Sequence, residues 1–532
     1  MDSKRLVIAL ALSLIVLFGW SYLFPPDEPK TPPAPVAAAP ADTKIEAANP
    51  AASPAPAAAV VGQGRKVSVT TPLFEARFNA QGGLLESLAL KNFHETLSKD
   101  SALINMVGEK PQAAMGVVLL PQGSEVHTWN QPGWTYEGAD AVDIPAGQKQ
   151  TLTFSGEAAG LKLQRRLTLS ADSYLITEEL TVTNPGATPV SGKVAFTAAS
   201  QGLAPAGDKY NQTRLAYGKV KNGFNEVTDM GDMEKGVDSK DPVNWGAIES
   251  NYFLFAVAPV GEGAVMNGRH KDGVFNIAVA QPATFEPGQS KTLTCSYYAG
   301  PADRAMLAGM PNKLAEAVDF GWFHLIAVPL LQLLNWFNQY VHNYGIAIIL
   351  LTVLVKLVFW PLSQKSYKSM EQMKKLQPML QKLREKYADD KERMNTEIMA
   401  LYKTYKVNPA GGCLPMVVQI PVFFGLYKAL LGSIELRHAP FITHVPFTDI
   451  VWLADLSAMD PYYVTPLIMG ATMFIQQKMT PSGGDPMQAK IMLLMPVVFT
   501  FMFLNFPAGL VVYWLVNNVL SIAQQWWMMR KA

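Results

Sequence analysis

The sequence predicts a polytopic α-helical membrane protein with six transmembrane helices and a large antiparallel β-sandwich domain outside the membrane. Of its 532 residues, 49% are hydrophobic and only 16% are charged, whereas ordinary soluble domains have about 25% charged residues. Long apolar runs occur at the N-terminus and after residue 320, and the part between them alternates in polarity. Lys and Arg total 44 against 43 for Asp and Glu, so a generally basic nucleic-acid binder is excluded and no specific DNA binding is expected.

The N-terminal segment, residues 6–24, has nineteen residues without a charge and follows Lys4 and Arg5. A helix of this length covers about 28 Å, close to one bilayer core. A secretory signal has a shorter apolar run and a small-residue cleavage site soon after it, but the nearest such site here is at residues 37–39. Residues 1–24 are therefore predicted to be an uncleaved signal-anchor transmembrane helix, with a cleaved signal as the alternative.

Residues 25–60 contain ten prolines and thirteen alanines, a composition typical of an extended linker that cannot bury a core. Residues 61–320 then change to short alternating segments, separated by turn sequences such as Asn184-Pro185-Gly186. This pattern predicts the β-sandwich. The clearest strands are expected at residues 73–78, 161–169, 174–182, 252–257 and 292–298.

Residues 321–342 are apolar but contain His324, Pro329 and several aromatic residues, among them Trp322 and Trp336. If this segment crossed the membrane, the lysine-rich segment after the next span would lie outside, against the positive-inside rule. It is therefore predicted to be an amphipathic helix on the outer membrane surface. We expect this helix to be the sole link between the sandwich and the rest of the protein.

Five more spans are predicted after it, at residues 343–363, 410–432, 461–479, 488–505 and 508–529. Residues 364–408 contain eleven Lys or Arg and six Asp or Glu, a net charge of +5, and should lie in the cytoplasm. The loop 433–460 has Arg437 against four acidic residues and suits the outside. Six spans with both termini cytoplasmic satisfy every short loop.

No nucleotide-binding, zinc-protease, redox or hydrolase motif is present in the sequence, and its seven histidines show no metal-ligand spacing. We therefore expect no catalytic residues, no metal and no cofactor. Paired carboxylates of a sugar-acting enzyme leave no sequence motif, so that alternative stays open for the sandwich.

Lys356 stands alone among apolar residues of the 343–363 span, with Thr352 four residues earlier on the same helix face. A charge near the centre of a membrane helix costs about 2.5–3.5 kcal/mol on insertion scales. The lysine could snorkel to the cytoplasmic headgroups. Because the five later spans contain no acidic residue, we favour a hydrated cavity around Lys356.

The later spans are unusual as well. Pro415 and Pro421 should break the 410–432 helix twice, with Gln419 between them. The apolar run at residues 491–506 has only sixteen residues, and Asn505-Phe506-Pro507 leads directly into the last span. Such helices would be expected to thin the bilayer locally, although ordinary packing is the alternative for each feature alone.

The cytoplasmic segment 364–408 is predicted to be a helical hairpin with a basic outer surface. Apolar residues recur at three- and four-residue steps through Leu376 and Leu380 in the first helix and through Leu401 and Tyr405 in the second. Asp389 with Glu392 is a plausible capping box for the second helix. The hairpin is either a solvated topology anchor or a docking site for ribosomal RNA or anionic lipid, with contacts expected from Lys374, Lys375, Lys382 and Arg384.

The whole chain resembles the YidC/Oxa/Alb insertase family. The resemblance rests on five stretches: Phe359-Trp-Pro-Leu-Ser-Gln-Lys365, Met373-Lys-Lys-Leu-Gln-Pro378, Tyr405-Lys-Val-Asn-Pro-Ala-Gly-Gly-Cys-Leu-Pro415, Asp460-Pro-Tyr-Tyr463 and Phe506-Pro-Ala-Gly-Leu510. It implies a non-catalytic, sugar-mutarotase-like sandwich and a five-helix insertase core, residues 343–532, that encloses a hydrophilic groove. The family's groove cation falls on Lys356, where many relatives have arginine. The other groove residues are expected to be Thr352, Gln419, Ile420, Pro421, Met473 and Trp514.

The resemblance further implies a membrane protein insertase and chaperone of the bacterial inner membrane, with its large domain in the periplasm. Its expected partners are nascent membrane proteins, the ribosome, anionic lipids and a Sec-type translocon (SecYEG, SecDF). Since the sequence ends at Arg530-Lys531-Ala532, without the long basic tail of some relatives, the hairpin should make most of the ribosome contact. The alternatives are a small-solute transporter or channel with Lys356 as an anion site, and a membrane-anchored carbohydrate-binding module.

Overall fold

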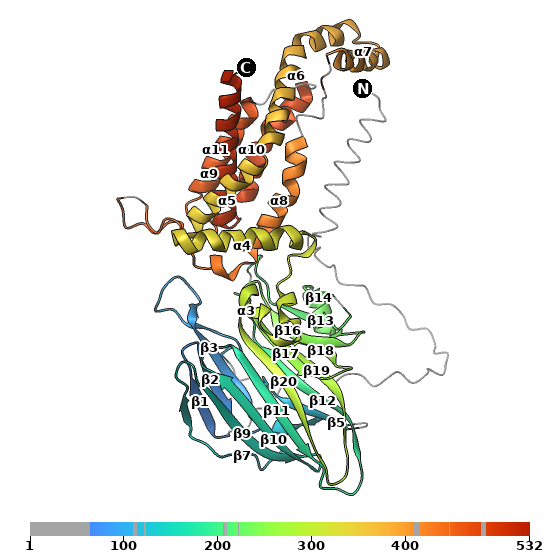
Figure 1. Ribbon diagram of the computed structural model, residues 1–532, viewed down its shortest axis with the longest axis vertical. Helices are drawn as coiled ribbons and strands as arrows, with labels where there is room; N and C mark the ends of the chain where they lie inside the picture. Colours follow the sequence, from blue (N-terminus) through green and yellow to red (C-terminus); the bar gives the residue numbers. More distant parts are fainter. Residues whose placement is uncertain are drawn as a thin grey trace, which may run out of the picture.

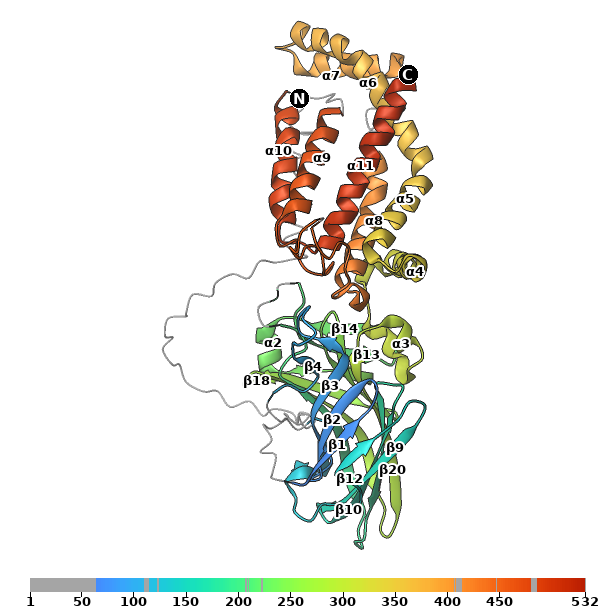
Figure 2. The ribbon, with the colours of Figure 1, turned by 90° about the vertical axis from the view of Figure 1, so that its left-hand side faces the viewer.

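The computed structural model describes residues 64–532 except 110–113, 122–123, 206–207, 209, 222, 406, 408–413, 446, 480–485 and 532. In this part of the chain a β-sheet domain is followed by a bundle of helices, and the two lie end to end (Figures 1 and 2). The expected anchor, residues 1–24, and linker, residues 25–60, lie outside the described residues.

The β-sheet domain is built from three sheets. The nine-stranded sheet has, in spatial order, β14 (Phe224–Val227), β13 (Arg214–Lys219), β16 (Val243–Glu249), β17 (Phe253–Val260), β20 (Ser290–Pro301), β11 (Leu175–Thr183), β10 (Leu161–Ser170), β9 (Lys149–Ala158) and β7 (Thr135–Tyr136). The six-stranded sheet has β15 (Val237–Asp238), β18 (Val265–Lys271), β19 (Val274–Phe285), β12 (Val190–Ser200), β5 (Val117–Pro121) and β6 (Val126–His127). The five-stranded sheet has β4 (Leu103–Asn105), β3 (Leu84–His94), β2 (Phe74–Asn79), β1 (Lys66–Thr70) and β8 (Ala141–Asp143).

The sandwich forms because strands of these sheets are apolar on one face. In β10 every second residue from Leu161 to Leu169 is buried, and the residues between them face outwards. β12 and β19 of the six-stranded sheet pack against β16 and β17 of the nine-stranded sheet. The five strands predicted from the sequence are confirmed as β2, β10, β11, β17 and β20. The expectation of an entirely antiparallel sandwich was too simple, since β1 pairs with β8 in parallel.

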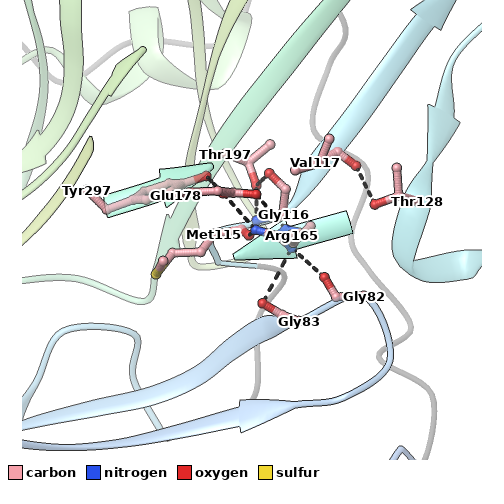
Figure 3. A network of polar contacts seen from close by, with 10 residues as sticks. All are labelled: Gly82, Gly83, Met115, Gly116, Val117, Thr128, Arg165, Glu178, Thr197 and Tyr297. Atoms are coloured by element: carbon pink, nitrogen blue, oxygen red, sulfur yellow. Dashed lines mark hydrogen bonds and ion pairs between the residues drawn. The ribbon is translucent and has the colours of Figure 1, made fainter. Parts of the chain in front are cut away.

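A buried ion pair joins the three sheets (Figure 3). Arg165 of β10 donates from Nε to Glu178 Oε1 of β11 at 2.6 Å, and the Tyr297 hydroxyl of β20 donates to Glu178 Oε2 at 3.0 Å. The same guanidinium donates to the carbonyls of Gly82, at the turn between β2 and β3, and of Met115, before β5. The charge is thus fully compensated inside the core.

The helical part consists of α4 (His324–Val341), α5 (Tyr344–Val358), α6 (Trp360–Lys386), α7 (Lys391–Thr404), α8 (Leu414–Leu431), α9 (Val464–Met479), α10 (Pro486–Phe503) and α11 (Ala508–Lys531). Two short helices, α2 (Met230–Lys235) and α3 (Arg304–Ala308), belong to the β-sheet domain. Within the described residues, no individual helix has both the length and the apolar character needed to cross a membrane, but two bent pairs pass that test together. They are Pro311–Ala317 with Gly321–Val341, bent by 101°, and Tyr344–Val358 with Trp360–Lys386, bent by 63°.

The α4 helix lies across the end of the bundle, between the other helices and the β-sheet domain (Figure 1). Ala327, Leu331 and Leu334 are buried against the bundle, whereas the aromatic side chains of Trp336 and Tyr340 are exposed. Helix α4 thus has one face buried against the bundle and lies at the position where the sequence predicts the interfacial helix.

Several expected boundaries were wrong. The helix expected to run to residue 363 ends at Val358, because the chain bends at Phe359 and α6 begins with Pro361 in its first turn. Pro415 is the second residue of α8, where a missing N–H costs nothing, so of the two prolines only Pro421 interrupts this helix. α7 is capped by Asp390, which accepts from Arg393 N, and not by Asp389.

The hairpin of α6 and α7 does form. Leu376 and Leu380 of α6 are buried with Val407, and Ile398, Leu401 and Tyr402 of α7 pack against them. Tyr405, expected in this contact, is exposed, because α7 ends at Thr404 and Tyr402 packs against the cluster in its place.

Candidate functional site

Lys356 lies in the last turn of α5, and its side chain is buried against α11. Its Nζ donates a hydrogen bond to Ser521 Oγ at 2.6 Å, and Ser521 Oγ donates in turn to the carbonyl oxygen of Asn517 at 2.7 Å. Thr352, one turn earlier, is also buried and donates to the Ile348 carbonyl at 2.6 Å. Within the described residues no carboxylate forms an ion pair with Lys356, so only neutral oxygen faces its charge.

The polar face of α11 continues on both sides of Ser521. Asn518 donates from Nδ2 to Thr472 Oγ1 of α9 at 3.4 Å, and Gln525 donates from Nε2 to the Met479 carbonyl at 2.8 Å. Gln524 Nε2 is buried without a hydrogen-bond partner among the described residues. Sequence analysis missed Ser521, Gln524 and Gln525. The sequence does contain a signal for this polar face, because polar residues recur at the three- and four-residue spacing of one helix face. They are Asn517, Asn518, Ser521, Gln524 and Gln525.

Aromatic rings fill the other end of α11. The centroid of the Trp514 ring lies 4.6 Å from the ring centroid of Phe423 in α8. It lies 5.4 Å and 6.4 Å from the ring centroids of Phe503 and Phe499 in α10. Met473 of α9 is half-buried against the same apolar cluster. Trp514 Nε1 is buried and has no hydrogen-bond partner in the described part of the chain.

The expected groove residues of α8 lie apart from Lys356. Gln419 and Pro421 are half-buried, and Ile420 is 46% exposed. Among the described residues, no hydrogen bond or ring contact connects these three side chains with Lys356. The structure therefore brings together Lys356 and Thr352 with α11, and Trp514 with Phe423 of α8, but leaves Gln419, Ile420 and Pro421 on a more open part of the bundle.

The four basic residues expected to contact a ribosome or lipid differ in their surroundings. Lys374, Lys375 and Lys382 are exposed on α6, and Lys375 pairs with Glu371 at 2.6 Å. Arg384 is half-buried and close enough to Tyr402 to interact electrostatically. Three of the four side chains are thus exposed to solvent, whereas Arg384 belongs partly to the packing of the hairpin.

Two of the sequence stretches that resemble the insertase family, residues 460–463 and 506–510, make hydrogen bonds near the starts of α9 and α11. Asp460 Oδ2 accepts from both the backbone N, at 2.7 Å, and the Oγ1, at 2.8 Å, of Thr465, near the start of α9. Its Oδ1 accepts from Trp452 Nε1 at 3.0 Å. At the start of α11, Gly509 donates its backbone N–H to the Leu456 carbonyl at 2.9 Å, and a side chain there would meet Leu456, Leu436 and Ile348.

The β-sheet domain touches the bundle at more places than α4. Arg437, in the loop before α9, donates to the His94 carbonyl at 2.5 Å and lies 5.4 Å from the ring of Phe253. Tyr210 packs against Phe506, between α10 and α11, at 5.6 Å. The expectation that α4 alone links the two parts was therefore wrong, because the loop contacts join residues far apart in the sequence.

Comparison with known proteins agrees with this organisation. Residues 66–333 match the family model of the YidC periplasmic domain, and residues 336–532 match that of the 60Kd inner membrane protein. The chain is 54% identical to a membrane protein insertase YidC of Nitratidesulfovibrio vulgaris, with 100% of both chains covered. It is 52% identical to the protein of the same name from Maridesulfovibrio salexigens, covering 100% of this chain and 99% of the relative.

Among solved structures, an active YidC insertase with its first transmembrane domain resolved aligns with 87% of this chain and 92% of its own. That alignment has 18% identity and a TM-score of 0.37, too low to transfer any geometry. The assignment therefore rests on sequence. Two family models in succession and full-length relatives with more than half of their residues identical show that the chain belongs to the YidC family of membrane protein insertases.

Proposed function

We propose that this chain inserts integral proteins into the bacterial inner membrane through a hydrophilic groove that bears one positive charge, and that it assists their folding as a chaperone. In the proposed topology the protein has six spans, both termini are cytoplasmic, and the sandwich lies in the periplasm. Membership of a non-enzymatic insertase family supports the activity. The observation that carries the groove hypothesis is Lys356, a buried cation that faces the Ser521 hydroxyl and no described carboxylate.

The proposed role of Lys356 follows from the cost of moving acidic residues. Each Asp or Glu of a substrate's outer segment loses several kcal/mol of hydration when it enters the bilayer. A cation at about 4 Å, with an effective dielectric constant near 20, returns about 4 kcal/mol before desolvation is subtracted. A neutral partner such as Ser521 leaves this attraction available to a substrate, whereas a paired carboxylate would cancel it.

In this mechanism the polar face of α11 gives a hydrated path for the outer segment. Thr352, Asn518, Gln524 and Gln525 are buried polar residues of α5 and α11, the two helices that carry Lys356 and Ser521. The apolar segment of the substrate then slides into lipid past Ile420, Met473 and Trp514, with Gln419 and Pro421 at the open side of α8. No covalent step and no cofactor is required.

We further propose that the exposed lysines of α6 contact the ribosome or anionic lipid headgroups, which brings nascent membrane proteins to the groove. Three exposed cations on one helix provide the electrostatic attraction that such a polyanionic partner needs. A Sec-type translocon, formed by SecYEG with SecDF, is the proposed partner for substrates with large translocated domains.

An insertion assay on matched substrates tests the groove charge. We expect Lys356→Ala to slow the insertion of substrates with acidic outer segments and to affect neutral versions less, whereas Lys356→Arg should retain activity because it keeps the charge. Each variant is compared at equal amounts in the same membranes. Ser521→Ala is the matched control, since it removes the neutral partner and leaves the cation. Equal rates for Lys356 and Lys356→Ala on acidic substrates would contradict the electrostatic mechanism, and anion flux without insertion would favour a channel.

A further inference from the structure

The loop between α8 and α9 carries an arm, residues 441–453, whose tip exposes apolar side chains. Asp449 is the only acidic residue in this arm, which has no lysine or arginine. Phe447 is fully exposed (106%), and Ile450 and Val451 are 48% and 51% exposed. Three uncovered apolar side chains at one tip indicate a surface that faces something other than water.

Backbone hydrogen bonds give the arm a defined shape. The N–H of Phe441 donates to the Leu453 carbonyl at 2.9 Å, that of Trp452 to Thr443 at 3.1 Å, and that of Val445 to Ile450 at 2.9 Å. His444 and Val451 form an antiparallel bridge. These hydrogen bonds satisfy backbone groups along the two sides of the arm, and the groups stay paired when the tip enters a less polar medium.

The base of the arm is fixed at the corner between α4 and α5. Asn343 caps α5 by accepting from Ile346 N at 3.0 Å, and its Nδ2 donates to the Phe441 carbonyl at 3.1 Å. The Phe441 ring lies directly against Gly345, where it leaves no room for a side chain. The orange arm therefore projects sideways from the bundle at the level of α4 (Figure 1).

We propose that residues 441–453 form a second interfacial membrane anchor, with Phe447, Ile450 and Val451 inserted at the boundary between headgroups and acyl chains of the outer leaflet. The inference rests on the proposed topology, in which α4 lies on that same membrane surface. Aromatic and apolar side chains on a rigid support suit this boundary. Because the arm has no lysine or arginine, its insertion requires neither anionic lipid nor low salt.

The anchor gives the loop 433–460 a fixed height on the membrane. Arg437, which holds the β-sheet domain at the His94 carbonyl, belongs to the same loop. The arm and α4 thus support the periplasmic side of the bundle at two separate places, which resists tilting better than α4 alone.

Fluorescent labelling of the full-length protein in vesicles of zwitterionic lipid tests this proposal. An environment-sensitive probe is attached to the cysteine of Phe447→Cys or, as a second position, of Ile450→Cys. Both variants also carry Cys413→Ser, and the remaining Cys295 is buried and so shielded from the reagent. The matched control is Leu97→Cys, an apolar position in a loop of the β-sheet domain that is 49% exposed, close to the exposure of Ile450. Trp322→Cys, fully exposed just before α4, is the reference for the membrane surface.

We expect probes at 447, 450 and 322 to show blue-shifted emission and strong quenching by lipids that carry a nitroxide near the headgroup, at both low and high salt. The probe at 97 should show neither. If 447 and 450 behave like 97 while 322 is quenched, the arm is not a membrane anchor and the proposed topology stands. If 322 is not quenched either, the topology itself is wrong. Shielding of 447 in cell membranes but not in pure lipid vesicles would assign the arm to a protein partner and overturn the lipid anchor.

Discussion

At the scale of single residues, the buried pair of Arg165 and Glu178 holds parts of three sheets in place. We expect Glu178→Gln to destabilise the β-sheet domain by about 3–5 kcal/mol, because it leaves the Arg165 charge uncompensated inside the core. Denaturant unfolding of the full-length protein, followed by tryptophan fluorescence, measures the loss. The matched control is Glu179→Gln, which removes an exposed pair with Arg166 and should cost less than about 1 kcal/mol. Equal effects of the two substitutions would contradict the assigned role.

A second residue-scale prediction concerns Glu249, at the contact between the β-sheet domain and the bundle. It lines a cavity of about 110 Å³ together with Arg214, Glu226, Asp319 and Lys428. Burial raises the pKa of Glu249 to about 7 from 4.5, and Arg214, at 2.9 Å, opposes this only in part. The folded protein therefore holds this proton more tightly than the unfolded chain, so stability falls as pH rises from about 4.5 to about 7 and changes little above that.

We expect Glu249→Gln to remove this part of the pH dependence, since glutamine does not titrate. Thermal unfolding midpoints of the full-length protein at a series of pH values from about 5 to about 8 would show a flatter profile than the wild type. Glu179→Gln, an exposed glutamate on the same sheet, should keep the wild-type profile. The same slope in wild type and Glu249→Gln would show that another group is responsible.

At the scale of elements, the α6–α7 hairpin makes a prediction about charge. Reversal of Lys374, Lys375 and Lys382 to glutamate should weaken binding to ribosomes or anionic vesicles and reduce its salt dependence, because fewer counterions are released. Arg384 is kept, since it is half-buried in the hairpin. The control reverses Lys149, Lys240 and Lys291, which are exposed on the β-sheet domain and change the net charge equally. If both triple variants bind alike, the hairpin serves only as a topology anchor.

At the scale of the whole molecule, we propose that the β-sheet domain is a scaffold for an insertion activity located in the helices. Deleting most of it while keeping residues 321–344 should leave the insertion of short substrates largely intact, because Lys356 and the α6 lysines lie beyond this point. The contacts of Arg437 with His94 and of Tyr210 with Phe506 now add a second expectation, a lower unfolding temperature of the bundle. Insertion rate and thermal unfolding are measured on the same preparations. Complete loss of insertion in a stably expressed deletion would contradict this division of labour.

The sequence by itself determined the order of the described parts, the five clearest strands, a helix after the sandwich and the isolation of Lys356 in an apolar run. These features are local. Alternation, helical periodicity and a lone charge in an apolar run can each be recognised within a short stretch of sequence. The two periodic patterns depend only on the backbone geometry of strands and helices. The helix boundaries at Phe359 and Asp390 were missed by only a few residues, as expected where capping and bending compete locally.

Only the tertiary structure decided which distant residues meet. Ser521 approaches Lys356 across 165 residues, Arg165 reaches Gly82 across 83, and Arg437 reaches His94 across 343. Each pairing depends on how whole sheets and helices pack, and many partners with the same local pattern would satisfy the sequence equally well. Packing therefore determined that the lysine faces a hydroxyl, that one arginine joins three sheets, and that the loop before α9 links the two parts of the molecule.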